Sequence, residues 1–536
     1  MADSSVVRTG ARVFPELSQA QKAVDQTNRW DRRKMLIGFL IVVILLVPFN
    51  AAFERAGPYM DEGSLLVYPE LIGRGAVPYR DFETFYGPAN IYVLAATYSL
   101  FGTNVIVERA VGLLYRALIL SLLFALIARW NVTLAGGCTA LAAWLLLLEA
   151  GISAYAWFGG IACLLASLWL MAGARFNTRF SFAGLLGGCA VLYRADLAPA
   201  VILSALPLLH LAPTGKRVHY SIGIAAGLLP FGLLTWCIGV NELINNLFLY
   251  PVFYSNPARH LPMSTVEPYV RALFIMHLLA AGLNIIAGVM GVHVQPADLR
   301  RRLLLSLALL AATITAQAAQ RLDLFHLTCA AFLAIGILPL SLLALANCGG
   351  EWRLPLAHVW LATIIVCASV EAVAPEVAGL VKEESLAAVI PSEDDVHFVQ
   401  HAGRSFPCPT RREAVVVTRM LDWLEQESAS GQRLFVGPSD LRRTSYCDTF
   451  IYHLMPTLRP NGYFLEMNPL SANRPGSRLA DDISSSDWLV LDRAIDAWKE
   501  ENRSLEFQSD LPNQVVSEKF QLAAKFGPYL VFHRKS

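Results

Sequence analysis

The stretch YMDEGSLLVYPELIGRGAVPYRDFETFYGPANIYVLAATYSLFG, residues 59–102, decides how the rest of the chain is interpreted. It follows the first long apolar run and holds five of the twelve acidic residues of the first third of the chain, beginning with Asp61 and Glu62. Ionised side chains beside a membrane anchor are costly unless they meet water, a counter-charge or a substrate. This stretch is therefore the first place to look for a functional site.

The composition indicates a membrane protein. Of 536 residues, 55% are hydrophobic and only 16% are charged, whereas soluble domains average about 25% charged residues. The formal net charge of +1 argues against nucleic acid as a partner. The nine Cys residues show no metal-ligand spacing, so no cofactor and no dedicated metal site are predicted. A divalent ion shared by Asp61 and Glu62 is the one exception we consider.

Long apolar runs predict about eleven membrane-spanning helices within residues 35–374. The first covers about residues 35–53, and no cleavable signal is evident, so this run is expected to stay as an anchor. The other ten are expected at about residues 110–128, 134–148, 158–172, 182–192, 197–211, 221–240, 270–292, 303–319, 327–346 and 356–373.

The charges of the loops predict the orientation of these helices in a plasma membrane. Arg29, Arg32, Arg33 and Lys34 precede the first span, which places the N-terminal tail, residues 1–34, in the cytoplasm. The first outer loop, residues 54–109, and the C-terminus then lie outside. Two apolar pieces of that loop, residues 65–72 and 91–101, are too short to cross about 30 Å of hydrocarbon. They are predicted to be helices that lie along the outer membrane surface.

Residues 375–536 change character and predict an extracytoplasmic α/β domain. The apolar runs shorten to strand length in RLFVG (433–437), DWLVL (487–491) and YLVFH (529–533), and a helical pattern covers about residues 412–428. Cys408 and Cys447 fall in this domain, where they would form either a disulfide or two free thiols.

The outer loop suggests transfer of a sugar from a lipid phosphate. Such a reaction needs a carboxylate to take the proton of the acceptor hydroxyl, cations to hold the phosphate, and an apolar groove for the lipid tail. Asp61 is the best candidate for the base, although a carboxylate at the start of a helix is also explained as an N-cap. Glu62 is expected either to assist Asp61 or to be solvated.

Several cations are candidates for binding the phosphate. Arg194, in LYRADLAP, is the most informative, and its alternative role is a salt bridge with Asp196. Arg80, in PYRDF, would contribute or else pair with Asp81. The weaker candidates are Arg259 and His260, and then Arg321 and His326 with the neighbouring Asp323, for which the alternative is a structural ion pair. Tyr86 would stack on a sugar or anchor the loop at the interface.

The order of a helix with a cytoplasmic N-terminus, Asp61-Glu62, an amphipathic helix, GRGAVPYRDFETFYGPANIYVLAATYSLFG and Arg109 resembles the GT-C glycosyltransferases. The resemblance is to the branch of the protein O-mannosyltransferases and lipid A aminoarabinose transferases, and it covers about residues 35–211. It implies a polyprenyl-phosphate-sugar donor used at the outer face. It also implies Asp61 as the general base, Glu62 as its acidic partner, and Arg194 at the lipid phosphate.

The chain departs from these relatives at two places. The second outer loop, AGISAYAWFGG, has no acid, and Gly87 stands where aminoarabinose transferases have Lys before the Pro of the second motif. The sugar and the acceptor, whether glycan, lipid or protein, therefore remain open.

Two other classes of function are considered. A transporter or lipid flippase would be expected to show internal repeats and charges near the midplane, but no repeat is visible and the charges gather at one surface. A catalytically inactive envelope-assembly protein would bind partners through its C-terminal domain and would not need Asp61, Glu62 or Arg194.

Overall fold

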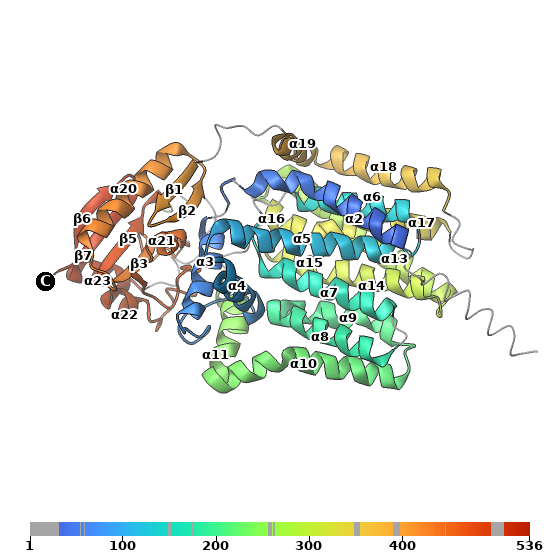
Figure 1. Cartoon of the computed structure of the whole chain (residues 1–536), viewed down its shortest axis with the longest axis horizontal. Helices are drawn as coiled ribbons and strands as arrows, with labels where there is room; N and C mark the ends of the chain where they lie inside the picture. Colours follow the sequence, from blue (N-terminus) through green and yellow to red (C-terminus); the bar gives the residue numbers. More distant parts are fainter. Residues whose placement is uncertain are drawn as a thin grey trace, which may run out of the picture.

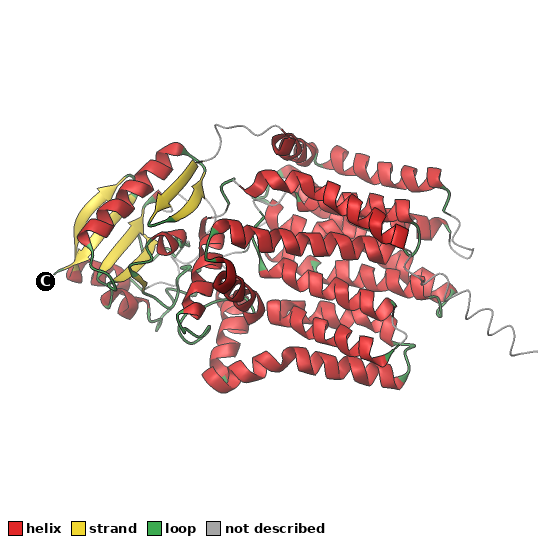
Figure 2. Ribbon diagram, viewed as in Figure 1, coloured by secondary structure: helices red, strands yellow, loops and turns green. Residues whose placement is uncertain are grey.

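The computed structural model describes residues 32–147 except 54 and 58, 152–173, 176–255, 260, 263–347, 354–389, 397–494 except 445, and 509–535. Within these residues the chain forms a bundle of long helices with an α/β domain at one end (Figure 1). Most of the predicted N-terminal tail and the candidate Arg259 lie outside the described residues. Figure 2 shows that the named strands belong to the C-terminal part of the chain.

Each segment that was predicted to span the membrane lies on a helix or a pair of consecutive helices. These elements are α2 (Arg32–Leu46) with η1 (Val47–Phe53), α5 (Val105–Ile127), α6 (Val132–Leu146), α7 (Ala156–Ala172), α8 (Asn177–Tyr193), η2 (Ala195–Leu197) with α9 (Ala198–Leu209), α10 (Thr214–Ile238), α13 (Pro268–Val294), α14 (Leu299–Thr313) with α15 (Thr315–Gln320), α16 (Leu324–Gly336) with α17 (Leu338–Ala346), and α18 (Leu356–Val373).

By length and composition, seven helices among the described residues could cross a membrane, and three shorter helices are also apolar. The prediction of a multi-pass helical membrane protein is therefore confirmed, while the number eleven stays a prediction. Large apolar side chains such as Phe39, Trp236 and Leu279 are exposed on these helices. Such exposure suits contact with lipid, which is as apolar as the side chains themselves.

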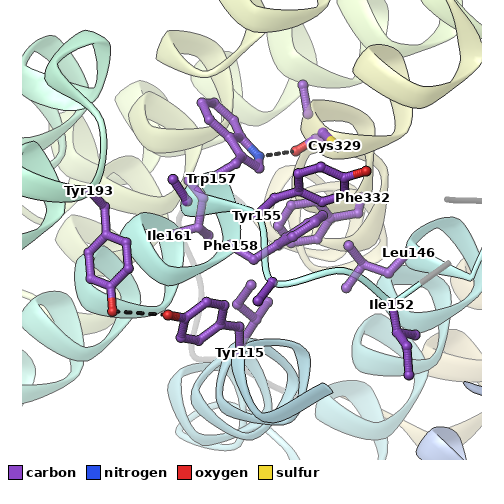
Figure 3. Packing of buried hydrophobic residues seen from close by; sticks show 14 of the residues in the cluster. Tyr115, Leu146, Ile152, Tyr155, Trp157, Phe158, Ile161, Tyr193, Cys329 and Phe332 are labelled. Carbon is purple, nitrogen blue, oxygen red and sulfur yellow. Dashed lines mark hydrogen bonds between the residues drawn. The ribbon is translucent and has the colours of Figure 1, made fainter. Parts of the chain in front are cut away.

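The core of the bundle contains aromatic side chains from several helices (Figure 3). Tyr115 of α5 and Tyr193 of α8 bring their hydroxyl oxygens to 3.3 Å. Trp157 of α7 donates its indole N–H to the carbonyl oxygen of Cys329 on α16, at 3.0 Å. These bonds satisfy polar atoms that would otherwise be buried without a partner, and the Trp157 bond ties the start of α7 to α16.

Helices α3 (Tyr59–Gly73) and α4 (Pro88–Phe101) lie at the end of the bundle, beside the C-terminal domain (Figure 1). Both begin before the predicted apolar pieces. Pro88 suits the first turn of α4 because its missing N–H is not needed there, and the acidic first turn of α3 suits the positive end of the helix dipole. The predicted polar loop after α10 contains α11 (Val240–Ile244) and the π-helix η3 (Asn245–Ser255).

Helix α19 (Pro375–Val389) packs against η1 and α18 of the bundle, and the α/β fold begins after it. Strands β1 (His397–His401) and β2 (Arg404–Cys408) form a hairpin. A five-stranded sheet follows in the order β4-β3-β5-β7-β6. Its strands are β3 (Arg433–Pro438), β4 (Arg459–Pro460), β5 (Trp488–Asp492), β6 (Phe520–Phe526) and β7 (Tyr529–Arg534), and the helices are α20 (Arg411–Glu427), α21 (Phe450–Leu454), α22 (Leu479–Ser484) and α23 (Leu511–Lys519).

The centre of the sheet coincides with the predicted strands. Strand β5 runs parallel to β3, with Phe435 opposite Leu489, and antiparallel to β7, with Val490 opposite Val531. Cys408 and Cys447 are buried free thiols, so of the two predicted alternatives the structure has the free thiols. The Cys447 Sγ donates to the carbonyl oxygen of Leu465 at 2.9 Å.

Candidate functional site

A cavity of about 480 Å³ lies between the helical bundle and the C-terminal domain. Its wall is built from α3, the loop before α4, the start of α7, the turn before α9, the π-helix η3, the α15–α16 junction and two loops of the C-terminal domain. The Asp, Glu, Arg and His residues among its lining are Asp61, Arg194, Asp196, Arg321, Asp323, His326, Asp448 and Glu466. A concave site with a few converging polar groups on an otherwise apolar wall is typical of ligand binding.

A second hollow of about 400 Å³ adjoins this cavity and shares five lining residues with it, among them Trp157, Asp196 and Gln317. The rest of its wall is mostly apolar and comes from η2, α9, α14, α15 and the residue His260. The exposed His260 lines this hollow rather than the main cavity. The main cavity therefore continues into an apolar hollow between helices.

Asp61 is the third residue of α3 and lines the main cavity. It does not cap the helix, as the N-cap alternative would require, because it already lies in the first turn. A carboxylate in this position faces the positive end of the helix dipole, which stabilises its ionised form. Asp61 also lines a small pocket that opens between α3 and α4.

Glu62 lies elsewhere, although it is the next residue. Its two carboxylate oxygens accept hydrogen bonds from Arg109 Nε at 2.8 Å and Nη2 at 2.7 Å, and both side chains are fully buried. Ser153 Oγ donates to the same carboxylate at 2.8 Å. Neighbouring residues of a helix do not share a face, so Glu62 points into the bundle and is absent from the cavity wall. This geometry does not fit the predicted assistance to Asp61, nor a divalent ion that both carboxylates would bind.

The predicted second outer loop, which has no acid of its own, is held by acids of other segments. The backbone N–H of Ala154 donates to Glu108 Oε1 at 2.5 Å, and Asn90 Nδ2 donates to the carbonyl oxygen of Ala154 at 2.8 Å. Gly112 of α5 is needed here because a Cβ would collide with the backbone of Ile152. Tyr155, which follows Ala154 in the chain, lines the cavity. The buried charges thus fix one wall of the cavity.

Arg194 lines the cavity and also forms the salt bridge with Asp196 that was its alternative role. Its Nη2 lies 2.6 Å from Asp196 Oδ2 and donates to Gln317 Oε1 at 3.0 Å. The guanidinium lies over the rings of Trp157 and Tyr86, 5.2 Å and 5.8 Å from their centroids. The Arg194 side chain keeps 17% of its surface exposed and Asp196 keeps 48%, so an anion that enters the cavity can reach this ion pair.

Arg321, Asp323 and His326 form a second ionic cluster in the same wall. Arg321 Nε lies 2.9 Å from Asp323 Oδ2, and His326 Nδ1 lies 2.8 Å from Asp323 Oδ1. Asp323 also caps α16 by accepting from the backbone N–H of His326. Burial acts to raise the pKa of Asp323, but the bonds from His326 and the charge of Arg321 outweigh burial and hold that pKa at about 2. Asp323 is therefore ionised and holds the side chains of Arg321 and His326 in place.

Arg80 is not brought to the cavity. Its side chain is 52% exposed and pairs with Asp81, with Nη2 2.7 Å from Oδ2. Tyr86, in contrast, lines both the cavity and the small pocket. Glu83 is buried, and Asn468 Nδ2 donates to it at 3.2 Å.

The C-terminal domain supplies a wall that the sequence analysis did not include. Tyr446, Cys447, Asp448, Glu466 and Asn468 line the cavity from two loops. Tyr446 has a positive φ angle of 72°, and Met467, which lies between Glu466 and Asn468, has one of 54°. Non-glycine residues rarely adopt this conformation, and it is enriched at functional sites. The one hint in the sequence is that the acids of these loops stand among apolar residues, as in FLEM.

Asp448, the residue after Cys447 in this wall, holds its proton more tightly than an ordinary Asp because it is buried. Burial and the nearby Asp492 carboxylate raise the pKa of Asp448 to about 8, while the hydroxyl of Tyr529 donates to Asp448 Oδ2 at 2.7 Å. Among the described residues, no group of three or more His, Cys, Asp or Glu is placed to hold a metal ion.

The C-terminal domain is fastened directly to α3. Thr449 Oγ1 donates to the carbonyl oxygen of Met60 at 2.6 Å, and Gly63 leaves no room for a Cβ against Thr449 and the backbone of Phe450. Further along α3, Arg404 Nη2 pairs with Glu70 Oε1 at 2.6 Å. The domain is therefore seated one turn or less from Asp61, which encloses the cavity.

No protein-family model matches the chain, and no curated protein sequence matches it. Two solved structures are similar to this chain at 14% identity, and each match covers 92% of this chain and 97% of the other chain. They are ArnT from Cupriavidus metallidurans bound to undecaprenyl phosphate, with a TM-score of 0.52, and the same protein in the apo state, with 0.51. The arabinofuranosyltransferase AftD from Mycobacteria is similar at a TM-score of 0.42 and 15% identity, over 94% of this chain and 42% of that chain. The two ArnT structures show that this chain has the GT-C fold.

Proposed function

We propose that the chain is a membrane glycosyltransferase that moves a sugar from a polyprenyl-phosphate donor to an acceptor, at the outer face of the plasma membrane. The observation that supports this most strongly is that Asp61, Arg194, Arg321 and His326 line one cavity, which continues into an apolar hollow. A base, cations and an apolar groove are the three elements that this reaction needs. The solved ArnT structure with the same fold binds undecaprenyl phosphate, which is a lipid of this class.

The reaction moves charge in a direction that the cavity can accommodate. The acceptor oxygen forms a bond to the anomeric carbon of the sugar, and the bond from that carbon to the phosphate oxygen breaks. The acceptor proton passes to Asp61, which becomes neutral, and the phosphate leaves with one more negative charge than it had in the donor. Preorganised cations aimed at developing charge lower the barrier of such a step. Arg194 and the Arg321–His326 cluster have this role in the proposal.

The ion pairs do not prevent the cations from binding a phosphate. Asp196 remains about half exposed and Asp323 is partly exposed, so water or a phosphate oxygen can compete for the same guanidinium groups. Tyr86 and Trp157 flank Arg194 with flat apolar surfaces, which suits the face of a sugar ring. The adjoining hollow would take the first isoprene units, with His260 at its wall.

The geometry gives less support to the other two classes of function. The charged residues converge on one cavity at the end of the bundle beside the C-terminal domain, whereas a transporter site is expected near the middle of the membrane. An inactive assembly protein would not need a carboxylate and two cationic clusters enclosed together in one cavity.

The experiment replaces Asp61 with Asn in the full-length chain. Sugar transfer is measured in membranes with a panel of undecaprenyl-phosphate-linked sugars as donors. Loss of the general base is expected to lower transfer by about 10²–10⁴-fold, while binding of undecaprenyl phosphate persists because Arg194 and Arg321 are unchanged.

The matched control is Asp81→Asn, which removes an exposed carboxylate of the same outer loop that does not line the cavity. This variant is expected to transfer sugar like the wild type. Equal turnover by the Asp61→Asn protein and the wild type would remove Asp61 as the base. Failure of the wild type both to bind undecaprenyl phosphate and to use any donor would contradict the proposed function itself.

A further inference from the structure

Asp61 has a carboxyl neighbour across the cavity. Glu466, in a loop of the C-terminal domain, lines the main cavity together with Asp61, and the two residues also line the small pocket beneath it. Glu466 is only 6% exposed. Asn468 Nδ2 donates to its Oε2 at 3.3 Å, while Oε1 has no hydrogen-bond partner among the described residues. A buried carboxyl oxygen without a hydrogen-bond partner, in a residue that lines a cavity, points to a proton or a ligand hydroxyl at that atom.

The surroundings of Glu466 contain acids and neutral groups but no cation. On α3 it faces Asp61, Ser64 and Tyr68, and from its own domain Cys447 and Asn468. Glu83 lies behind Asn468. Among the described residues, no Arg, Lys or His forms an ion pair with Glu466. This wall therefore differs from the cationic wall opposite.

Two interacting carboxyl groups in one enclosed cavity do not both ionise easily, so their proton affinities separate. Burial, and then the charge of Asp61, raise the pKa of Glu466 to about 7, although contacts with Tyr68, Asn468 and Ser64 act in the opposite direction. Asp61 lies at the positive end of α3 and Glu466 does not. We therefore expect the proton to stay on Glu466 of the C-terminal domain and the negative charge to stay on Asp61 of α3.

We propose that Glu466 is a positioning residue for the reaction, which keeps a proton beside Asp61 and so leaves Asp61 as the ionised carboxylate of the pair. This inference rests on the proposed function. In the transfer step Asp61 accepts the acceptor proton while Glu466 stays neutral, so the Asp61–Glu466 pair carries a single negative charge when the anionic donor enters. Ionisation of Glu466 would add a second negative charge opposite the donor phosphate and weaken donor binding.

The first experiment measures the pH dependence of transfer by the full-length wild type and by Glu466→Gln, which resembles the protonated acid. For the wild type, the KM for the donor is expected to rise above about pH 7, about tenfold for each further pH unit. For Glu466→Gln this alkaline rise is expected to disappear, with transfer at pH 6.5 within about threefold of the wild type. An unchanged alkaline limb in Glu466→Gln would overturn the proposal, and so would a loss of transfer as deep as that of Asp61→Asn.

A second measurement needs no sugar transfer. Because the folded-state pKa of Glu466 is raised above 4.5, the folded protein holds a proton that the unfolded chain has released between about pH 4.5 and 7. The wild type therefore loses thermal stability as the pH rises through this window, and Glu466→Gln is expected to lose less. Parallel melting curves of the two proteins across this window would overturn the proposal, whether or not the glycosyltransferase function holds.

The matched control is Asp482→Asn. Burial also raises the pKa of Asp482, but this carboxylate accepts from the backbone N–H of Tyr463 at 2.8 Å and does not line the cavity. The control is expected to change the stability profile and to leave the alkaline limb of transfer in place. If Glu466→Gln does not fold, Glu466→Asp keeps a titrating carboxyl, and the proposal then requires that its alkaline limb shifts in pH and persists.

Discussion

Two groups of charged side chains lie at the end of the bundle beside the C-terminal domain, and they differ in their exposure to water. Glu62 and Arg109 are fully buried and satisfy each other through two hydrogen bonds. The cavity pairs Arg194–Asp196 and Arg321–Asp323 keep between 12% and 48% of their side-chain surfaces exposed. Both groups contain good bidentate or short ion pairs, so the geometry of the pairs alone does not distinguish their roles.

The difference in exposure does distinguish them. A buried ion pair cannot exchange its partner for a ligand, and the loss of one member leaves an uncompensated charge in the core. A pair at a cavity wall can exchange its partner for a phosphate oxygen, because water and ligand reach it. Adjacent residues such as Asp61 and Glu62 can therefore serve chemistry and folding separately.

The largest effect is expected when the buried pair is broken. Glu62→Gln leaves the Arg109 charge buried without its carboxylate and should cost about 3–5 kcal/mol of stability. Thermal denaturation of the purified protein in detergent measures this loss. The double variant Glu62→Leu/Arg109→Met should lose less than the single variant, since it removes both charges together. A Glu62→Gln protein with normal stability and no transfer would instead place Glu62 in the chemistry.

An intermediate effect is expected at the cavity wall. Arg194→Gln removes the cation that we propose at the donor phosphate, which should lower transfer by about 10–150-fold, or about 1.5–3 kcal/mol. Its thermal stability should change little, because the Arg194 pair is open to water. Arg80→Gln is the control: it removes an exposed cation outside the cavity and should change transfer by less than about twofold. Equal losses of transfer in the two variants would erase the distinction between cavity and surface cations.

The smallest effect is expected at the junction between the two domains. Burial acts to raise the pKa of Glu70, but bonds from His453 and Arg404 outweigh it and lower that pKa to about 2. A lowered pKa gives stability that is present above about pH 4.5 and is lost as the pH falls towards 2. Arg404→Gln should therefore cost about 1 kcal/mol at neutral pH and flatten the acid limb of a stability profile. An acid limb identical to that of the wild type would show that Arg404 does not stabilise the junction.

The sequence predicted the elements and the helical wall of the site for identifiable physical reasons. Membrane-length apolar runs, short β-type runs and alternating loop charges are local signals. The loop charges predicted that Arg194, Arg321 and His326 lie on the same side of the bundle as Asp61. In the structure all four residues line one cavity.

The remaining parts of the site depend on information that is not local. The orientation of Glu62 depends on the phase of α3, in which neighbouring side chains diverge. Glu466 and Asp448 lie in irregular loops, and their place in the cavity follows from how the C-terminal domain is seated on α3. No spacing rule connects those loops with residue 61.

The bond from Thr449 to Met60 joins residues 389 positions apart in the chain. Such a contact is among the last that a chain can form, because a ribosome makes the N-terminal partner long before the other. The anchor helix and Asp61 are made early, yet the cavity around Asp61 has no complete wall until the loops near residues 446–468 have been made and the domain has docked. During synthesis the nascent chain thus carries Asp61 without the C-terminal wall of the cavity, and the enclosed cavity exists only in the finished molecule.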